Sequence, residues 1–466
     1  MSPPILLTPV SRRLAVALLL AAGAVHAAEP SPKPWNLHDA VGAPANLQLS
    51  GTVRVRLETL SGQDRVGLDP SFSVASLRST VFAEYHKDWF RIGGELWDSR
   101  AYPREPGSGI SNSDVNALEP VQAFVGADFG APFGKGSAAS AQLGRFVLNL
   151  GSRRLVAADD YRNTTNGYSG LRVDLKSAGG NTATFIYTEP QVRLPDRLDG
   201  VLDNDVKLDR ESPDLVLWGG VVALPALLPI ATLEGSWYGL KERDRADLAT
   251  RDRNLHSAGV RLFRDPKAET LDFEFEAIRQ TGSIRASTAA NAALLDVLAS
   301  FYHAEAGYQW AGGSKPHVAL EYDYASGDDG DSQYGRFDTL FGTRRADIAP
   351  SGLYGAVGRT NLRALGLRLE ATPTARFDYM ASYRALWLAS RTDSFSTTGV
   401  RDASGRSGDF AGYQFDGRVR YWVIPRSLRF EVDAVVLAKG RFLDDAPNAP
   451  QNGDTHYLSV NIASQF

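Results

Sequence analysis

Apolar and polar residues alternate along many short segments of the chain, which is the pattern of a β-strand with one apolar and one polar face. In the segment GTVRVRLETL, which begins at residue 51, Val53, Val55 and Leu57 share one face. Arg54 and Arg56 share the other face. The segments LDFEFEAI and SLRFEVDAVV repeat this alternation with charged residues on the polar face. The pattern therefore predicts strands that separate an apolar side from a polar side.

The last segment, HYLSVNIASQF, follows the same period and ends on an aromatic residue. One face carries Leu458, Val460, Ile462 and Phe466, and the other carries Ser459, Asn461 and Gln465. A soluble domain usually leaves its last residues polar and loose. A final strand that ends in an aromatic residue resembles the terminal strand of bacterial outer-membrane barrels. An edge strand of a soluble sandwich shows the same alternation, so the connections between strands must decide between the two.

About 18 segments of this kind can be placed along the chain. They start near residues 47, 74, 89, 119, 138, 166, 181, 213, 231, 254, 270, 298, 316, 361, 376, 411, 427 and 455. Short links alternate with long ones such as 150–165, 190–212 and 327–360. This asymmetry, together with aromatic residues near the strand ends, is typical of outer-membrane barrels. An even number of strands also lets the last strand pair with the first, which removes the open edges.

The sequence therefore predicts an all-β fold, a closed antiparallel transmembrane β-barrel of about 18 strands over residues 47–466. Short turns are expected on the periplasmic side and long loops on the extracellular side. Residues 1–27 have the form of a signal peptide, because Arg12 and Arg13 precede an apolar run and a small-residue site ends at Ala27. Residues 28–46 are then a periplasmic N-terminal segment, and the barrel is expected in the cell outer membrane. No later stretch approaches ~18 apolar residues, so no membrane-spanning helix is expected.

Composition narrows the function classes. The chain has no Cys, which excludes disulfides and metal sites built on thiolates. Its net charge is −4 with 22% charged residues, so it has no basic surface for nucleic acid. Only nine of its 50 Lys and Arg residues are Lys. Arg binds carboxylates through two parallel hydrogen bonds, so the excess of Arg indicates anion recognition. A GC-rich genome would also raise the Arg content.

The stretch from 143 to 175, LGRFVLNLGSRRLVAADDYRNTTNGYSGLRVDL, resembles the alginate-export family of outer-membrane proteins. The resemblance rests on an ordered set of residues: Gly144-Arg145, Leu148, Gly151, Arg154-Leu155-Val156, Arg162-Asn163, Tyr168, Gly170 and Arg172. Three later segments also match the family: EYDYASGD at 321–328, FDTLF at 337–341 and GYQFDGRVRYWVIP at 412–425. The chain departs from the family after FDTLF, where Arg344, Arg345 and Ala346 replace a His and an aromatic pair that many members carry.

The resemblance implies an 18-stranded barrel that passes an anionic polysaccharide, or a related anionic solute, through an Arg-lined constriction. The strand period independently turns several arginines towards the lumen: Arg54, Arg56, Arg78, Arg91, Arg172, Arg261, Arg368, Arg384, Arg418, Arg420 and Arg429. Rings of Arg or Lys select anions. Carboxylates on the same faces share the lumen, so many of these arginines are expected to stiffen the wall as ion pairs.

Ten arginines are predicted to line the solute path or its constriction: Arg145, Arg153, Arg154, Arg162, Arg172, Arg344, Arg345, Arg359, Arg384 and Arg418. Arg145 breaks the strand period, because Phe146 and Leu148 would then face water. A bulge would repair the pattern, and a position at the end of the strand would remove the conflict. The loop at 327–360 is longer than a simple connection, so it is expected either to fold into the lumen or to cover the mouth.

Other functions remain to be weighed against anion passage. A general or small-solute uptake porin is the alternative, and the direction of transport is not encoded in a passive pore. An enzyme is not expected, because Ser300 and His303 are three residues apart in a strand and point to opposite faces. Asp328, Asp329 and Asp331 offer oxygen ligands to calcium, but the final Glu of a calcium loop is missing. A solvated acidic loop is therefore favoured there.

No cofactor or resident metal is expected for such a channel. The expected partners are outer-membrane lipid and lipopolysaccharide, the barrel-assembly machinery, and an anionic saccharide or small acid as the solute. Nucleic acid is not expected as a partner, and the barrel is expected to be a monomer.

Overall fold

The computed structural model describes residues 34–466 except 103–106, 160, 226, 229, 246–247, 344–346 and 351. The predicted signal peptide, residues 1–27, lies outside the described residues. The predicted periplasmic segment, residues 28–46, is described from residue 34 onward and contains the short helix α2 (Leu37–Ala40). The N-terminus of this helix is capped by Asn36, whose side chain accepts the N–H of Asp39 at 2.8 Å.

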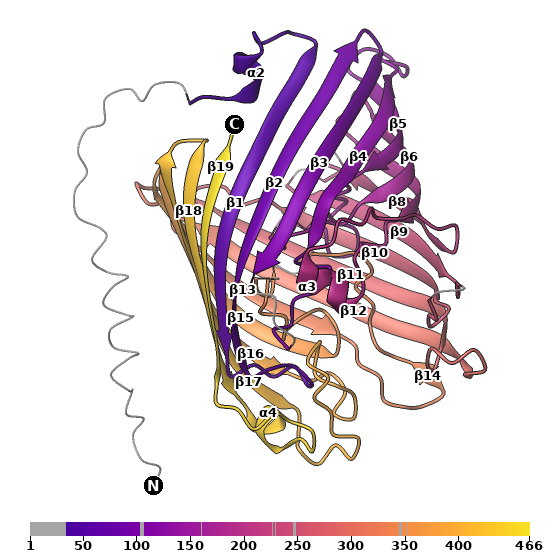
Figure 1. Cartoon of the computed structure of the whole chain (residues 1–466), viewed down its shortest axis with the longest axis vertical. Helices are drawn as coiled ribbons and strands as arrows, with labels where there is room; N and C mark the ends of the chain where they lie inside the picture. The colour runs from indigo at the N-terminus through magenta and orange to yellow at the C-terminus, as the bar shows by residue number, and fades with distance from the viewer. Residues whose placement is uncertain are drawn as a thin grey trace. The chain divides into compact units, whose positions relative to one another are not determined.

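Eighteen long strands in the described part of the chain form one antiparallel barrel, in which strands adjacent in the chain pair with each other (Figure 1). They are β1 (Leu47–Ser61), β2 (Ser71–Lys87), β3 (Phe90–Tyr102), β4 (Asn116–Asp128), β5 (Ala138–Phe146), β6 (Tyr168–Lys176), β7 (Thr182–Pro190), β8 (Leu215–Leu224), β9 (Thr232–Glu242), β10 (Asn254–Arg264), β11 (Thr270–Arg285), β12 (Leu294–Gln309), β13 (His317–Ala325), β15 (Leu362–Thr374), β16 (Phe377–Trp387), β17 (Phe410–Ile424), β18 (Leu428–Lys439) and β19 (Thr455–Gln465). A two-residue strand, β14 (Gln333–Tyr334), pairs in parallel with β12. Because β1 pairs with β19, the barrel has no open edge.

The predicted fold class is confirmed, and each predicted strand start lies within four residues of the observed one. The largest difference is at β12, which was expected near residue 298 and begins at Leu294. Its first two residues, Leu294 and Leu295, are both apolar, so the alternation becomes visible only further along the strand. The additional strand β14 was not expected, because two residues carry no period.

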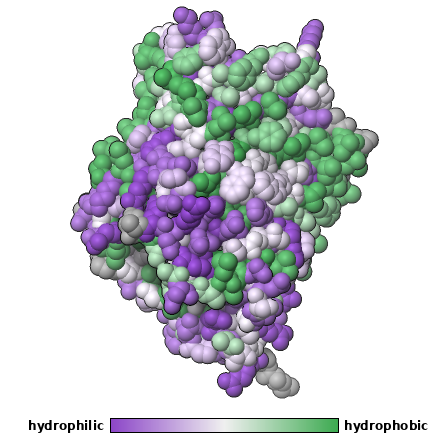
Figure 2. Space-filling view, turned by 90° about the vertical axis from the view of Figure 1, so that its right-hand side faces the viewer, coloured by the Kyte–Doolittle hydropathy of each residue, from purple (hydrophilic) through white to green (hydrophobic). Residues whose placement is uncertain are grey.

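The alternation along each strand separates a lumen face from a membrane face. In β1, Arg54, Arg56 and Glu58 are buried, while Val55 and Leu57 are exposed on the outside of the barrel. In a bilayer these outward apolar side chains contact lipid, and the charged side chains remain inside, where they find polar partners. Figure 2 shows that hydrophilic residues prevail at the lower end of one face, which is the end of the long loops in Figure 1.

The two ends of the barrel differ in their connections. Turns of a few residues join the strands at the end where β1 begins and β19 finishes, for example between β2 and β3 and between β17 and β18. Long loops lie at the other end and contain the helices α3 (Leu198–Asp203) and α4 (Arg441–Asp445). The short turns therefore face the periplasm and the long loops face the exterior. None of the helices in the described ranges is long and apolar enough to cross a membrane.

The terminal Phe466 extends the pairing that closes the barrel. Its N–H donates to the Gly51 carbonyl at 3.0 Å, and the Gly51 N–H donates to the Phe466 carbonyl at 2.7 Å. The Phe466 ring covers Gly51 so closely that a Cβ atom there would lie 2.4 Å from a ring carbon. The same ring packs against Trp35, with ring centroids 5.7 Å apart. The Phe466 ring thus covers the start of the closing seam.

We expect Gly51→Ala to destabilise the barrel, because the added methyl group must push the Phe466 ring away from its position. Overpacking of this kind typically costs about 1–3 kcal/mol. The variant should unfold at a lower urea concentration than the unmodified protein, measured by tryptophan fluorescence in lipid vesicles. Gly235→Ala in β9 is the matched control, because a Cβ atom there meets nothing within 4 Å. An equal loss of stability in both variants would contradict the assignment.

Candidate channel constriction

Two long loops turn back into the barrel and are named inner loop 1 (147–167) and inner loop 2 (336–361). Tyr161 of inner loop 1 reaches the wall at the closing seam. Its hydroxyl lies 2.8 Å from the Tyr457 hydroxyl and 3.0 Å from that of Ser459, both on β19. Arg56 of β1 donates to the Tyr161 carbonyl at 2.5 Å. A polar loop can enter the barrel because the polar lumen wall satisfies its backbone groups.

Asn163 holds inner loop 1 against a second part of the wall. Its buried side-chain amide lies within hydrogen-bonding distance of three carbonyl oxygens, those of Leu77, Arg100 and Asp114, at 3.2, 3.1 and 2.8 Å. Such a buried amide is satisfied only when the loop occupies this position. Inner loop 1 is therefore fixed against the adjacent wall strands from β19 to β3.

The two inner loops also contact each other. Val156 and Phe341 form a parallel β-bridge, and the Asn166 side chain donates to the Phe341 carbonyl at 3.0 Å. Inner loop 2 reaches the wall where the N–H of Leu353 donates to the carboxylate of Glu58 at 3.0 Å. The predicted loop at 327–360 is divided in position: inner loop 2 lies in the lumen, whereas the residues before it, including β14, pair with β12 at the loop end of the barrel.

A cluster of ion pairs around Asp347 joins the two inner loops. Arg154 of inner loop 1 donates to the Asp347 carboxylate at 2.8 Å, and Arg359 of inner loop 2 binds the same group. Arg154 also pairs with Glu274 and Glu276 of β11, the latter at 2.5 Å. Burial opposes ionisation of Asp347, but the guanidinium groups of Arg154 and Arg359 outweigh it and hold its pKa well below the usual range. Asp347 therefore stays ionised at neutral pH.

Arg384 of β16 connects the wall to inner loop 2. It donates to Asp416 at 2.7 Å and to Glu321 at 2.8 Å, both on nearby strands. It also donates to the backbone carbonyls of Asp347 and Ile348 at 2.5 and 3.2 Å. The two carboxylates hold the Arg384 guanidinium in place on the wall. Its bonds to the loop carbonyls therefore fix the position of inner loop 2.

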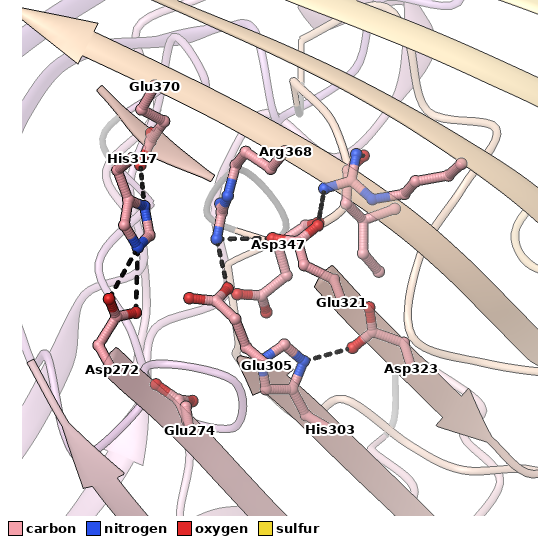
Figure 3. A network of polar contacts seen from close by, with 12 residues as sticks. Asp272, Glu274, His303, Glu305, His317, Glu321, Asp323, Asp347, Arg368 and Glu370 are labelled. Atoms are coloured by element: carbon pink, nitrogen blue, oxygen red, sulfur yellow. Dashed lines mark hydrogen bonds and ion pairs between the residues drawn. The ribbon is translucent and has the colours of Figure 1, made fainter. Parts of the chain in front are cut away.

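The wall beside Asp347 carries further pairs of polar side chains, shown in Figure 3. They are Arg368 with Glu305 and Glu321, His303 with Asp323, and His317 with Asp272 and Glu370. The carboxylates come from β11, β12, β13 and β15, so the pairs cross several neighbouring strands. This is the wall-stiffening role that the sequence also allowed for lumen arginines.

On the periplasmic side of inner loop 1 the lumen holds a cavity of about 110 Å³. Its lining includes three cationic side chains, Arg54, Arg420 and Arg429, and one carboxylate, Glu431. The strand register explains this convergence, because Ala463 of β19 lies opposite both Arg54 of β1 and Arg429 of β18. Guanidinium groups from both strands that flank β19 therefore meet at one level of the lumen.

Exposure separates two of these arginines, Arg420 and Arg429, from those around Asp347, whereas Arg54 is buried. The side chains of Arg420 and Arg429 are 30% and 28% exposed, although each has a carboxylate partner, Asp378 at 2.8 Å and Glu431 at 3.3 Å respectively. The side chains of Arg154, Arg359 and Arg384 are at most 5% exposed. Only the first group can contact a solute without displacing an inner loop.

Arg145 lies at the end of β5, where the register with both neighbouring strands is regular. Of the two explanations for its broken period, a strand-end position is therefore the observed one. Its guanidinium pairs with Glu119 at 2.7 Å and Glu211 at 2.5 Å, and it also donates to the Asp209 carbonyl at 2.9 Å. Arg145 thus holds the loop between β7 and β8 against the end of the wall.

The remaining predicted site residues are dispersed. Within inner loop 1, Arg153 donates to the Ala158 carbonyl at 3.0 Å, and Arg162 pairs with Asp159 at 3.2 Å. On β6, Arg172 pairs with Asp174 at 2.7 Å. On β17, Arg418 lies 3.9 Å from Asp378. Arg344 and Arg345 lie outside the described residues. The structure therefore brings Arg154, Arg359 and Arg384 together, but the eight predicted arginines that it describes do not form one ring.

Sequence reasoning missed the residues that organise the site. Arg420 and Arg429 were placed in the lumen by strand period but were not included in the predicted constriction. Asp347 and Tyr161 were not singled out, because a loop residue carries no period, and Asn163 was named only as part of the family resemblance. The alternation in GRVRYW was the one signal that could have directed attention to Arg420.

Two other sequence candidates can be located. His303 faces the lumen beside Asp323, whereas Ser300 accepts a hydrogen bond from Arg279 on the outer face, so the two side chains do not meet. Asp328 accepts the N–H of Gly335 at 3.1 Å within its own loop. Among the described residues no group of three or more His, Asp or Glu side chains is placed to hold a metal ion.

A closed barrel with a charged lumen and inward-folded loops defines an outer-membrane channel protein. The family model for alginate export matches residues 45–455. The chain therefore belongs to the alginate export family. No match was found among curated proteins.

Solved structures support the fold. OccAB3 of Acinetobacter baumannii is 11% identical with a TM-score of 0.58, covering 91% of this chain and 100% of that chain. OccK2 (OpdF) of Pseudomonas aeruginosa is 12% identical with a TM-score of 0.56, covering 91% and 98%. OccD3 (OpdP) of the same organism is 10% identical with a TM-score of 0.55, covering 90% and 91%. At these identities the likeness concerns the fold alone.

We expect Asp347→Asn to raise the conductance of the purified channel and the noise of its open state. Removing one partner of a buried ion pair typically costs about 3–5 kcal/mol, which weakens the docking of inner loop 2 on Arg154. Single-channel recording in a planar bilayer measures the effect. Asp445→Asn is the control, because it removes an exposed loop carboxylate that is paired with Arg441. A conductance identical to that of the control would refute this role of Asp347.

The loop between β7 and β8 should loosen as the pH rises. The buried Asp209 carboxylate accepts from Asn116 at 2.7 Å and from the Leu194 N–H at 2.8 Å. Burial, and then the charge of Glu119, raise its pKa from 3.8 to about 7. Because the docked loop binds the proton more tightly than the free loop, its docking is strongest below pH 3.8 and weakens up to about pH 7.

Hydrogen exchange of residues 191–214 at pH 5 and pH 8 measures this weakening, after correction for the intrinsic exchange rate. Protection should be lower at pH 8. In Asp209→Asn the side chain keeps its acceptor oxygen but no longer titrates, so protection should become independent of pH. The same pH dependence in both proteins would show that another group is responsible.

Proposed function

We propose that the protein passes anionic saccharides, or related organic acids, across the outer membrane through an Arg-lined lumen. The observation that carries this proposal is the convergence of Arg54, Arg420 and Arg429 on the cavity beside inner loop 1. A guanidinium group binds a carboxylate through two parallel hydrogen bonds. Because the cavity lies within low-dielectric walls, its positive potential also attracts anions from the periplasmic side.

Membership of the alginate export family supports an anionic polymer of uronate type as the solute. The ion pairs around Asp347 fit such a solute. A carboxylate of the polymer can take the place of Asp347 or Glu276 beside Arg154, so each exchange replaces one ion pair with another. A neutral sugar offers no charge to replace the displaced carboxylate and would leave a buried guanidinium unpaired.

A small-solute uptake channel is the second candidate. It is favoured by the size of the lumen cavity, about 110 Å³, which accommodates a small acid but not a saccharide chain. In this case the inner loops remain in place and the arginines of the cavity form a site for one carboxylate. Both candidates share anion selectivity and differ in whether the inner loops must move.

Single-channel recording tests the proposal. The unmodified protein should select anions in a salt gradient and should be blocked by uronate oligomers added on the periplasmic side. In Arg420→Gln/Arg429→Gln the block should be at least about tenfold weaker, since each charge-assisted hydrogen bond lost is worth about 1.5–3 kcal/mol and about 1.4 kcal/mol corresponds to a factor of ten. Arg426→Gln is the control, because Arg426 lies in the exposed turn between the same two strands.

The outcomes separate the candidates. Block by a uronate monomer but not by oligomers indicates the small-solute channel. Block by oligomers of increasing length, with increasing affinity, indicates passage of a polymer. A channel without ion selectivity, or a double variant indistinguishable from the Arg426 control, would refute the proposed role of the cavity.

A further inference from the structure

A groove of about 560 Å³ lies on the outward face of the barrel, beneath the loop that follows β13. Its floor includes Tyr302 of β12 together with Tyr322 and Tyr324 of β13. Tyr302 precedes the lumen-facing His303 and therefore points outward; its side chain is 47% exposed. The rings of Tyr302 and Tyr324 are 5.8 Å apart. The groove is thus an aromatic surface on the membrane side of the wall and is separate from the solute path.

The depth of the groove follows from strand geometry. Arg279 of β11 also lines it and lies opposite Ser300, one outward position nearer the loop end than Tyr302. Eight residues separate Arg279 from Leu271 at the periplasmic end of β11, which corresponds to about 27 Å along the strand. At a strand tilt of about 40° this is about 20 Å along the membrane normal, and the apolar belt of such barrels is about 25 Å tall. Arg279 therefore lies near the extracellular edge of the belt.

The positive charge of Arg279 lies near the edge of the apolar belt, where an anion would neutralise it. It donates to the Ser300 hydroxyl at 2.5 Å, and within the described residues no carboxylate forms an ion pair with it. On the periplasmic side of this position the outward residues are apolar, such as Phe275, Ala306 and Leu320. Charge, aromatic rings and apolar surface therefore follow one another from the loop end towards the membrane centre.

The loop above the groove is held in place. The Ser326 hydroxyl donates to the Gly335 carbonyl at 2.6 Å, and β14 pairs with β12 at the loop end of the barrel (Figure 1). Arg251 lies over the Tyr334 ring, 4.6 Å from its centroid. This loop places two exposed carboxylates, Asp329 and Asp331, on the groove opposite the cation.

We propose that this groove binds the headgroup of a phosphorylated glycolipid in the outer leaflet of the membrane. One phosphate pairs with Arg279, and the sugar ring lies on Tyr302 and Tyr324. A divalent cation bridges the phosphate to Asp329 and Asp331, since carboxylate oxygens are the ligands that Mg²⁺ and Ca²⁺ prefer. A lipid of this class presents phosphate, sugar and acyl chains in the order in which the groove presents charge, aromatic rings and apolar surface.

The site is independent of the proposed solute, because no side chain of the cavity at Arg54 takes part in it. It also accounts for the acidic loop that the sequence left as a calcium candidate. Two carboxylates hold an ion poorly by themselves, but a phosphate on Arg279 adds oxygen ligands and completes the coordination. The ion and the lipid are therefore expected to bind together.

Native mass spectrometry of the full barrel in detergent tests the site, with lipid A as the probe and Mg²⁺ present. The unmodified protein should retain one lipid A molecule per barrel, and lipid A from which the phosphates have been removed should bind at least tenfold more weakly. Arg279→Gln should cause a similar loss. Arg391→Gln is the matched control, because it removes an exposed loop arginine that is paired with Asp409.

The ion is tested separately. Chelation of Mg²⁺ should weaken lipid A binding to the unmodified protein several-fold. In Asp329→Asn/Asp331→Asn, binding should become insensitive to chelation, because the bridging ion has lost its protein ligands. Equal retention of lipid A by the Arg279 and Arg391 variants, or equal retention of phosphorylated and dephosphorylated lipid, would overturn the proposal. Planar-bilayer selectivity of Arg279→Gln should be unchanged, which distinguishes this site from the channel.

Discussion

Within the hydrocarbon of a membrane each backbone N–H and C=O group must find its partner in the protein, and this constraint shapes the molecule. The pairing of β1 with β19, extended by Phe466 onto Gly51, meets the constraint by closing the sheet. Closure gives each strand one face towards lipid and one towards the lumen. The charged residues of the strands must then lie inside, where the free energy of their burial is recovered only by pairing with opposite charges.

The strands could be predicted from the sequence because their signal is local. A period of two is visible within ten residues, so 18 strand starts and the lumen position of residues such as Arg54 and Arg420 followed from the chain alone. The conflict at Arg145 was visible as well, and the regular register of β5 shows that it reflects a strand end. The predicted signal peptide, residues 1–27, in contrast, lies outside the described residues.

The position of the loops could not be predicted in the same way. Arg154 and Asp347 are 193 residues apart in the chain, and nothing in either neighbourhood marks them as partners. Whether a lumen arginine is neutralised depends on which distant carboxylate reaches it. Arg384 is enclosed by Glu321 and Asp416, whereas Arg429 is more exposed. Sequence alone could not distinguish these two arginines. The eight described members of the ten predicted arginines are for this reason distributed over inner loops, wall and rim.

The distribution of the arginines affects how a barrel with two inner loops in its lumen could select its solute. The arginines around Asp347 are neutralised by the protein itself, whereas Arg420 and Arg429 at the cavity remain partly exposed to the lumen. An anion that enters at the cavity first binds exposed guanidinium groups, and only a solute with further negative charges can then replace the carboxylates that hold the inner loops. On the proposed function, charge selection and movement of the loops are therefore a single event, since the interaction that closes the lumen is the same interaction that recognises the solute.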